Sequence, residues 1–278
     1  MPAIQFGLAL PFGTSRMAAD LAQLAEQHGW DGCFLGDAIW CEDPLIALTA
    51  AAMTTTRIRL GTMVLAMPLR RPWHLASQSL AIDRLSQGRL ILGLGSGAVW
   101  MGWQGFPDFP TDKKTRAEML DESIDILTLL YQCKPFDFDG KHYHLMITRL
   151  DEKHYPPRPV QQPRIPLWVT GVIGYPKSMQ RLLKCDGVFP EKIDAQGQHQ
   201  DIQPEDIRQL RDYVQARRTL ETPFEIVVEG KLGGMTPGQQ QDKLLPLVEA
   251  GITWWVEGLW SEDQEQVEAH IRRGPAQR

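Results

Sequence analysis

The sequence predicts a (β/α)8 barrel, on three observations. Short apolar runs typical of buried strands alternate with amphipathic helical segments along the whole chain. Eight such runs are present, which is the number that closes this barrel. The chain has 278 residues, a length that suits one barrel domain of about 250 residues. An open doubly wound sheet is the alternative, because one sequence does not show whether a sheet closes.

The predicted elements alternate in order along the chain. Strands are expected at Ile4–Leu10, Gly32–Leu35, Ile58–Met67, Arg89–Leu94, Pro166–Thr170, Asp186–Phe189, Phe224–Val228 and Thr253–Glu257. Helices between them are expected at Ser15–His28, Asp43–Thr55, Trp73–Ser86, Thr115–Gln132, Tyr175–Leu183, Pro204–Thr219 and Gln239–Glu249. In the fourth helix, Leu120, Ile124 and Leu127 recur at helical spacing, so that one face of the helix can pack on a sheet.

The block from Arg57 to Gly97 shows the repeating unit most clearly. Two β-rich runs enclose a helical segment that opens after Pro72, and the second run ends in the glycine-rich loop Gly93–Gly97. A β-α-β unit with short loops implies parallel strands. Because barrels of parallel strands bind small molecules at the carboxyl ends of the strands, we expect the functional residues there.

The longest irregular region follows the fourth helix. We expect residues 1–278 to form one domain, with a short insertion of about residues 134–165 before the fifth strand. Within it, Asp139 and Gly140 separate two short aromatic runs, which predicts a β-hairpin. Loops of this length in a compact domain commonly form lids or partner surfaces.

Composition and charge exclude several classes of function. The net charge is −5 without a basic block, so neither nucleic acid nor an acidic membrane is an expected partner. We expect no membrane span, because no run approaches the roughly 18 apolar residues required, and no signal peptide. Four cysteines form no CxxC pair and no metal-like spacing with histidine. We therefore expect free thiols, a cytoplasmic location and no metal site.

Three loops at carboxyl ends of strands hold the candidate residues. Asp37 and Trp40 follow the second strand, as candidates for catalysis or, for Asp37, as a helix cap. Gly95, Ser96 and Gly97 follow the fourth strand, where glycine lets a flat ring approach the backbone. The loop after the fifth strand opens a helix whose N–H groups suit a phosphate. Its candidate residues are Thr170, Gly171, Gly174, Lys177 and Ser178. Arg70 and Arg71 are expected to be an exposed loop pair.

Four motifs resemble the bacterial luciferase-like flavin oxidoreductases: GT-V in the third strand, R-P-HLA at the next helix, DRLSQGR after it, and LGLGSG at the fourth strand. The resemblance implies the barrel fold and a flavin or deazaflavin ring bound at its mouth. It also implies a non-prolyl cis peptide at Met63–Val64 that props the ring, and a cofactor phosphate held near Gly171.

The sequence departs from one branch of that family at two positions. Relatives commonly carry a histidine where this chain has Ala38, and the deazaflavin-dependent sugar-phosphate dehydrogenases carry a glutamate where it has Ala98. Alanine cannot transfer a proton, so that particular acid–base chemistry is not expected.

The resemblance therefore favours a monooxygenase that uses reduced FMN and O2 on a small organic substrate, with FMN supplied by a separate flavin reductase. Hydride transfer with F420 and a non-catalytic flavin-binding role are alternatives, and an unrelated phosphate-binding barrel is a weaker one. Most relatives are dimers or larger, so self-association is expected.

Overall fold

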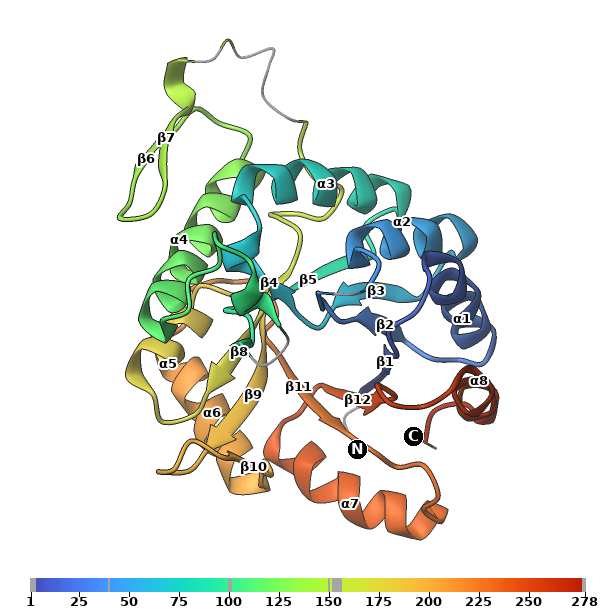
Figure 1. The fold of residues 1–278 in the computed structure, drawn as a ribbon. Coiled ribbons are helices and arrows are strands. Elements are labelled where there is room, and N and C mark those ends of the chain that lie inside the picture. The colour runs from blue at the N-terminus through green and yellow to red at the C-terminus, as the bar shows by residue number, and fades with distance from the viewer. Residues whose placement is uncertain (1–3, 40, 100–101, 150, 152–156, 277–278) are drawn as a thin grey trace.

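The computed structural model describes residues 4–39, 41–99, 102–149, 151 and 157–276. Eight parallel strands close into a barrel, in the order β1-β2-β3-β5-β8-β9-β11-β12 and back to β1. The predicted (β/α)8 barrel is confirmed, and the open sheet is excluded (Figure 1). The barrel strands are β1 Gln5–Leu10, β2 Gly32–Leu35, β3 Arg59–Thr62, β5 Leu90–Gly95, β8 Leu167–Val172, β9 Gly187–Ile193, β11 Glu225–Gly230 and β12 Trp254–Gly258.

Helices surround the barrel on its outside (Figure 1). They are α1 Ser15–Gln27, α2 Pro44–Thr54, α3 Pro72–Leu85, α4 Lys113–Tyr131, α5 Pro176–Leu182, α6 Pro204–Arg217, α7 Pro237–Ala250 and α8 Gln264–Arg273. The first seven lie where the sequence predicts them. The last, α8, was missed; its apolar face is short, with Val267 and Ile271 buried, and it packs beside α1.

The predicted third strand, Ile58–Met67, is not continuous. It divides into β3 and the two-residue strand β4 Leu65–Ala66, and its last residue begins a 3-10 helix, Met67–Leu69. β4 still pairs in parallel with β5. The break lies at Met63–Val64, and both side chains pack, partly buried, against the cluster of buried residues inside the barrel.

The insertion contains the predicted hairpin. Strands β6 Asp137–Asp139 and β7 His144–Met146 pair antiparallel, and the hairpin stands out from the barrel beyond α4 (Figure 1). The Glu122 carboxylate of α4 accepts backbone N–H groups of Lys141, His142 and Tyr143 in the turn, which fastens the hairpin to the barrel. A further short strand, β10 His199–Gln200, pairs antiparallel with the end of β9.

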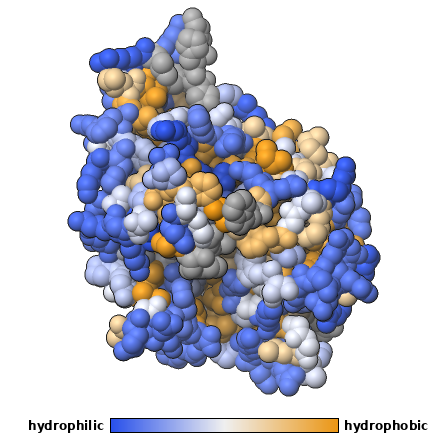
Figure 2. All heavy atoms as spheres, in the orientation of Figure 1, coloured by the Kyte–Doolittle hydropathy of each residue, from blue (hydrophilic) through white to orange (hydrophobic). Residues whose placement is uncertain are grey.

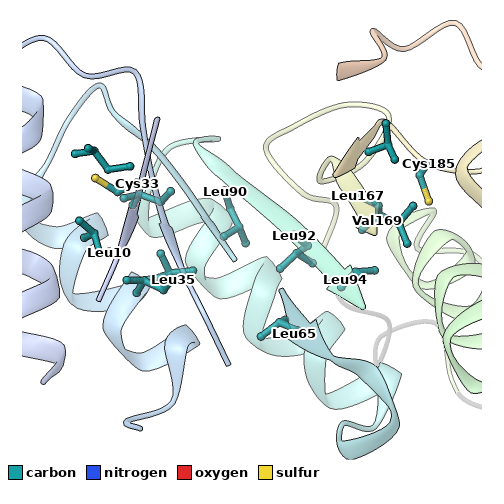
Figure 3. Close-up of a cluster of buried hydrophobic side chains, with 14 of the residues drawn as sticks. Leu10, Cys33, Leu35, Leu65, Leu90, Leu92, Leu94, Leu167, Val169 and Cys185 are labelled. Carbon is teal, nitrogen blue, oxygen red and sulfur yellow. The ribbon is translucent and has the colours of Figure 1, made fainter. Parts of the chain in front are cut away.

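The main core lies between the strands and the helices. Leu35 on β2, Leu92 on β5 and Leu167 on β8 are among its buried side chains, and Figure 3 labels all three. Alternate residues on the same strands point into the barrel, as the two-residue period of a strand requires. The outer face seen in Figure 2 is mainly hydrophilic, with smaller apolar areas between the polar groups.

Candidate functional site

We call the end of the barrel where the strands have their carboxyl ends the mouth. Aromatic rings fill the barrel interior below it. Phe34, Trp168 and Trp254 are buried inside it, with ring centroids 5.6 Å apart for Phe34–Trp168 and 5.5 Å apart for Trp168–Trp254. Neighbouring strands carry glycine at Gly32 and Gly61, where a Cβ would strike these rings. A cavity of about 290 Å³ at the amino ends of the strands is lined by the two tryptophans. The aromatic layer therefore separates the mouth from the cavity at the amino ends of the strands.

Val64, Gly95 and Thr170 meet on one side of the mouth. The Met63–Val64 peptide is cis, as the resemblance predicts. A Cβ on Gly95 would lie 2.6 Å from Val64 Cγ2 and 3.7 Å from Thr170 Oγ1, so Val64 lies directly over the glycine. Among the described residues, Thr170 makes no side-chain hydrogen bond. This side therefore offers the apolar side chain of Val64, backbone without a side chain at Gly95 and the hydroxyl of Thr170. This combination fits the flat ring of a flavin.

Asp37 is held in an ion pair rather than left free. Its carboxylate accepts hydrogen bonds from Arg70 Nε and Nη2, each at 3.1 Å, and from the Ala66 N–H at 3.2 Å. Arg70 also donates to Asp43 at 3.0 Å. The pKa of Asp37 is raised because burial disfavours the charge more than Arg70 favours it. Asp37 thus joins the loop after β2 to the segment that follows Val64.

The prediction that Arg70 and Arg71 form an exposed loop pair is therefore wrong for Arg70, whose side chain is only 16% exposed. Its two carboxylate partners lie 27 and 33 residues away in the sequence, a separation that no local pattern reveals. Arg71, in contrast, is exposed. Trp40, the other candidate after β2, lies outside the described residues.

The loop after β5 forms one wall of the mouth. Ser96 and Gly97 are half-buried, and Gly97 has a φ of +75°, a conformation that favours glycine. A Cβ on Gly97 would meet Ala66 and Phe109, two members of a small apolar cluster that Trp103 completes. This buried apolar cluster therefore packs against the loop after β5.

The loop after β8 has the predicted form of a strand, a glycine turn and a helix. Gly171 ends the buried part of β8, and Gly174 has a φ of +83° before α5 begins. Ser178 Oγ accepts the Val172 N–H at 2.9 Å, which ties α5 to β8, while Lys177 is exposed. The Ser178 hydroxyl oxygen thus already accepts one hydrogen bond within the protein, and the Lys177 ammonium lies in solvent.

Ala38 and Ala98 both lie half-buried at the mouth, on the β2 and β5 sides. With Asp37 paired to Arg70, no titratable side chain among the described residues of these two loops, 36–39 and 93–99, is free to transfer a proton. The described residues of these two loops therefore offer no free acid or base.

Two carboxylates that the sequence reasoning missed lie on the far side of the mouth. Phe189 and Val227 point into the barrel, so Glu191 and Glu229, two residues further along β9 and β11, point inward as well. Burial raises the pKa of both side chains. The predicted strands ended at Phe189 and Val228, one or two residues too early to include them. The inward and outward alternation of side chains, continued past the last apolar residue of each strand, would have placed both glutamates inside the barrel.

Two negative findings hold for the described part of the chain. None of its helices combines the length and the apolar character that crossing a membrane requires. None of its histidine, cysteine, aspartate and glutamate side chains gather in threes in a way that could hold a metal ion.

Comparison with known proteins gives a family match over most of the chain. The profile of the family described as luciferase-like monooxygenase matches residues 5–231. An F420-dependent glucose-6-phosphate dehydrogenase of Nakamurella multipartita is 29% identical over 177 residues, 57% of this chain and 50% of that protein. The 4-hydroxyprotoasukamycin monooxygenase of Streptomyces nodosus subsp. asukaensis is 34% identical over 115 residues, 39% of this chain and 31% of that protein.

The matches with these curated relatives thus span half of their length or less. Among solved structures, monooxygenase RslO1 from Streptomyces bottropensis superposes with a TM-score of 0.75 at 16% identity, covering 97% of each chain. At this identity the superposition establishes the fold alone.

Proposed function

Since the chain belongs to the luciferase-like monooxygenase family, we propose that its barrel mouth binds reduced FMN and that the protein oxygenates a small organic substrate with O2. The observation that carries the proposal is the meeting of Val64, Gly95 and Thr170 on one side of the mouth. Val64 lies between β3 and β4, Gly95 ends β5 and Thr170 lies in β8, and together they leave a largely apolar surface. Such a surface supports a planar ring through contact rather than through charge.

The remaining cofactor residues would hold the rest of the molecule. Thr170 offers a hydroxyl to the ring or its ribityl chain, and Gly97 and Ser96 expose backbone along the same wall. The first-turn N–H groups of α5, together with Lys177, would hold the phosphate. When bound, the reduced ring supplies the electrons that activate O2. The protein positions the ring and keeps water from it through the Trp103 cluster.

The lack of a free acid or base beside Ala38 and Ala98 supports oxygenation over sugar-phosphate dehydrogenation. In the proposed reaction the cofactor carries the difficult chemistry, so positioning and water exclusion are the main tasks of the protein.

Hydride transfer with F420 is the second candidate, because the relative from Nakamurella multipartita is named as F420-dependent. The same mouth would hold the deazaflavin ring. A flavin-binding relative without catalysis is the third possibility, motivated by the two alanines.

The partners we propose are a separate reductase that supplies reduced FMN, and a second copy of this chain. Helix α2 supports the second copy. It is apolar on nearly all sides, and Ile46 and Met53, on one stripe, are 60% and 65% exposed. We expect the double variant Ile46→Glu, Met53→Glu to be monomeric by analytical ultracentrifugation. A dimeric variant would exclude this face. Four free thiols support a cytoplasmic location.

Anaerobic titration tests the cofactor. Reduced FMN and F420 are added separately to the protein, and binding is followed by the spectrum of each ring. Micromolar binding of reduced FMN followed by substrate-dependent O2 uptake supports the monooxygenase. Binding of F420 alone, without O2 uptake, favours hydride transfer. Binding of FMN without uptake across a panel of aldehydes, ketones and phenols favours the non-catalytic role, and binding of neither ring refutes the proposal.

A further inference from the structure

The wall of the mouth opposite Met63–Val64 contains Glu229. Strand β11 is the fourth strand from β3 in either direction around the eight-stranded barrel, so these two strands lie across the barrel from each other. A ring resting on Val64 therefore turns its open face toward β11. Any substrate that approaches this face lies between the ring and Glu229.

The Glu229 side chain points into the mouth. Its neighbour Val227 belongs to the interior cluster, whereas Val228 packs on the helix side, so the alternation directs Glu229 inward. A Cβ on Gly258, on the adjacent strand β12, would strike the Glu229 carboxylate. The carboxylate thus occupies space that glycine leaves free.

An indole fixes this carboxylate in place. Trp260 Nε1 donates to Glu229 Oε1 at 2.6 Å, and the Trp260 ring packs 5.9 Å from Phe12. Both rings lie over Gly36, where a Cβ would meet them at 3.1 and 2.9 Å. Within the described structure, Trp260 is the only hydrogen-bond partner of the Glu229 side chain, which leaves Oε2 without a donor.

The surrounding charges do not neutralise this carboxylate. Desolvation raises the pKa of Glu229 by more than the Trp260 hydrogen bond and the Lys231 charge lower it. The Lys231 ammonium pairs with Glu262, at 3.6 Å. Glu191 on the neighbouring strand adds a second carboxylate to the same half of the mouth. Glu229 itself is exposed to solvent, so its free oxygen is open to a ligand at the mouth, and a charge-assisted hydrogen bond to a donor brought by that ligand would be stronger than one between neutral groups.

We propose that Glu229 is a specificity-determining residue that accepts a hydrogen bond from the substrate through Oε2. The substrate therefore carries a hydroxyl or a protonated amine at this point and no negative charge there. The aromatic pair Phe12 and Trp260 provides the apolar surface beside this group. This inference rests on the proposed function, since it places the substrate between Glu229 and the ring.

Three probes of nearly equal shape test the proposal: benzylammonium, benzyl alcohol and benzoate. Their dissociation constants are measured by ligand-observed NMR, with the protein free and with the ring that binds in the cofactor titration. We expect the wild type to bind benzylammonium at least tenfold more tightly than benzoate. In Glu229→Gln this preference falls below threefold, while the affinity for benzyl alcohol changes less than threefold, because the amide oxygen still accepts. The control Glu221→Gln changes an exposed glutamate before the amino end of the same strand and keeps the wild-type preference.

The inference is overturned if the wild type shows no such preference, including binding none of the probes, or if the preference survives in Glu229→Gln. Ring binding is measured separately on both proteins. A failure of the proposed function appears as absent ring binding in the wild type, whereas a failure of this inference appears as an unchanged probe preference.

Discussion

Gly95→Ala perturbs the contact on which the cofactor face depends. The new Cβ would lie 2.6 Å from Val64 Cγ2, whereas carbon atoms settle at about 3.5–4.0 Å, so Val64 must move by about 1 Å. Overpacking of this kind costs about 1–3 kcal/mol, and we expect the free energy of unfolding to fall by about 2 kcal/mol. Displacing Val64 also tilts the surface under the ring, so we expect about a tenfold loss of cofactor affinity, equivalent to about 1.4 kcal/mol.

Urea unfolding and fluorescence titration with the cofactor measure the two effects. The control Gly238→Ala lies in α7, where nothing approaches the new methyl group, and it should be neutral or slightly stabilising and leave cofactor affinity unchanged. The double variant Val64→Ala, Gly95→Ala removes the overlap and should recover most of the stability. A Gly95→Ala protein with unchanged stability and affinity would refute the placement of Val64 over Gly95.

Three further predictions concern other single side chains. Thr170→Val should leave the urea midpoint unchanged but weaken cofactor binding about fivefold, the worth of one hydrogen bond of about 1 kcal/mol; equal affinity would remove Thr170 from the site. Asp37→Asn should lower the free energy of unfolding in urea by about 2–3 kcal/mol, because it breaks a buried pair. Asp43→Asn should cost less than about 1 kcal/mol, since that carboxylate is 39% exposed and asparagine still caps α2; equal losses would contradict the pairing. Burial lowers the pKa of His270 in the folded protein below its ordinary value of 6.5. As the pH falls through 6.5, the unfolded chain therefore binds a proton at this histidine before the folded protein does, and the free energy of unfolding decreases. His270→Gln should therefore lose less stability than the wild type between pH 7.5 and 5.5 in urea unfolding, and an equal loss would contradict this origin.

The barrel could be predicted because its signals are local. A buried strand needs a short apolar run and a packed helix needs one apolar stripe, and both are visible in any window of the sequence. Helix α8 escaped because its polar residues dominate and only Val267 and Ile271 are buried in its apolar stripe. The division of the third strand escaped because Met63 and Val64 are themselves good strand residues.

The candidate site was predicted in part. Val64 follows β3, Gly95 ends β5 and Thr170 lies near the end of β8, and the carboxyl ends of these strands must meet, so topology alone brings the three residues together. The pairing of Arg70 with Asp37 depends on which side chains reach across two loops, and no sequence period records that. Glu229 escaped because polar residues at strand ends resemble loop residues, although they still alternate inward.

The central claim is that a tricyclic redox ring lies in the barrel mouth against Met63–Val64. A crystal structure of the protein soaked with reduced FMN or with F420 tests it most directly. We predict ring density in contact with Val64 and Thr170, its phosphate near Lys177, and its open face toward Glu229. A ring bound anywhere else, or a mouth without ring density at saturating cofactor, would contradict the account.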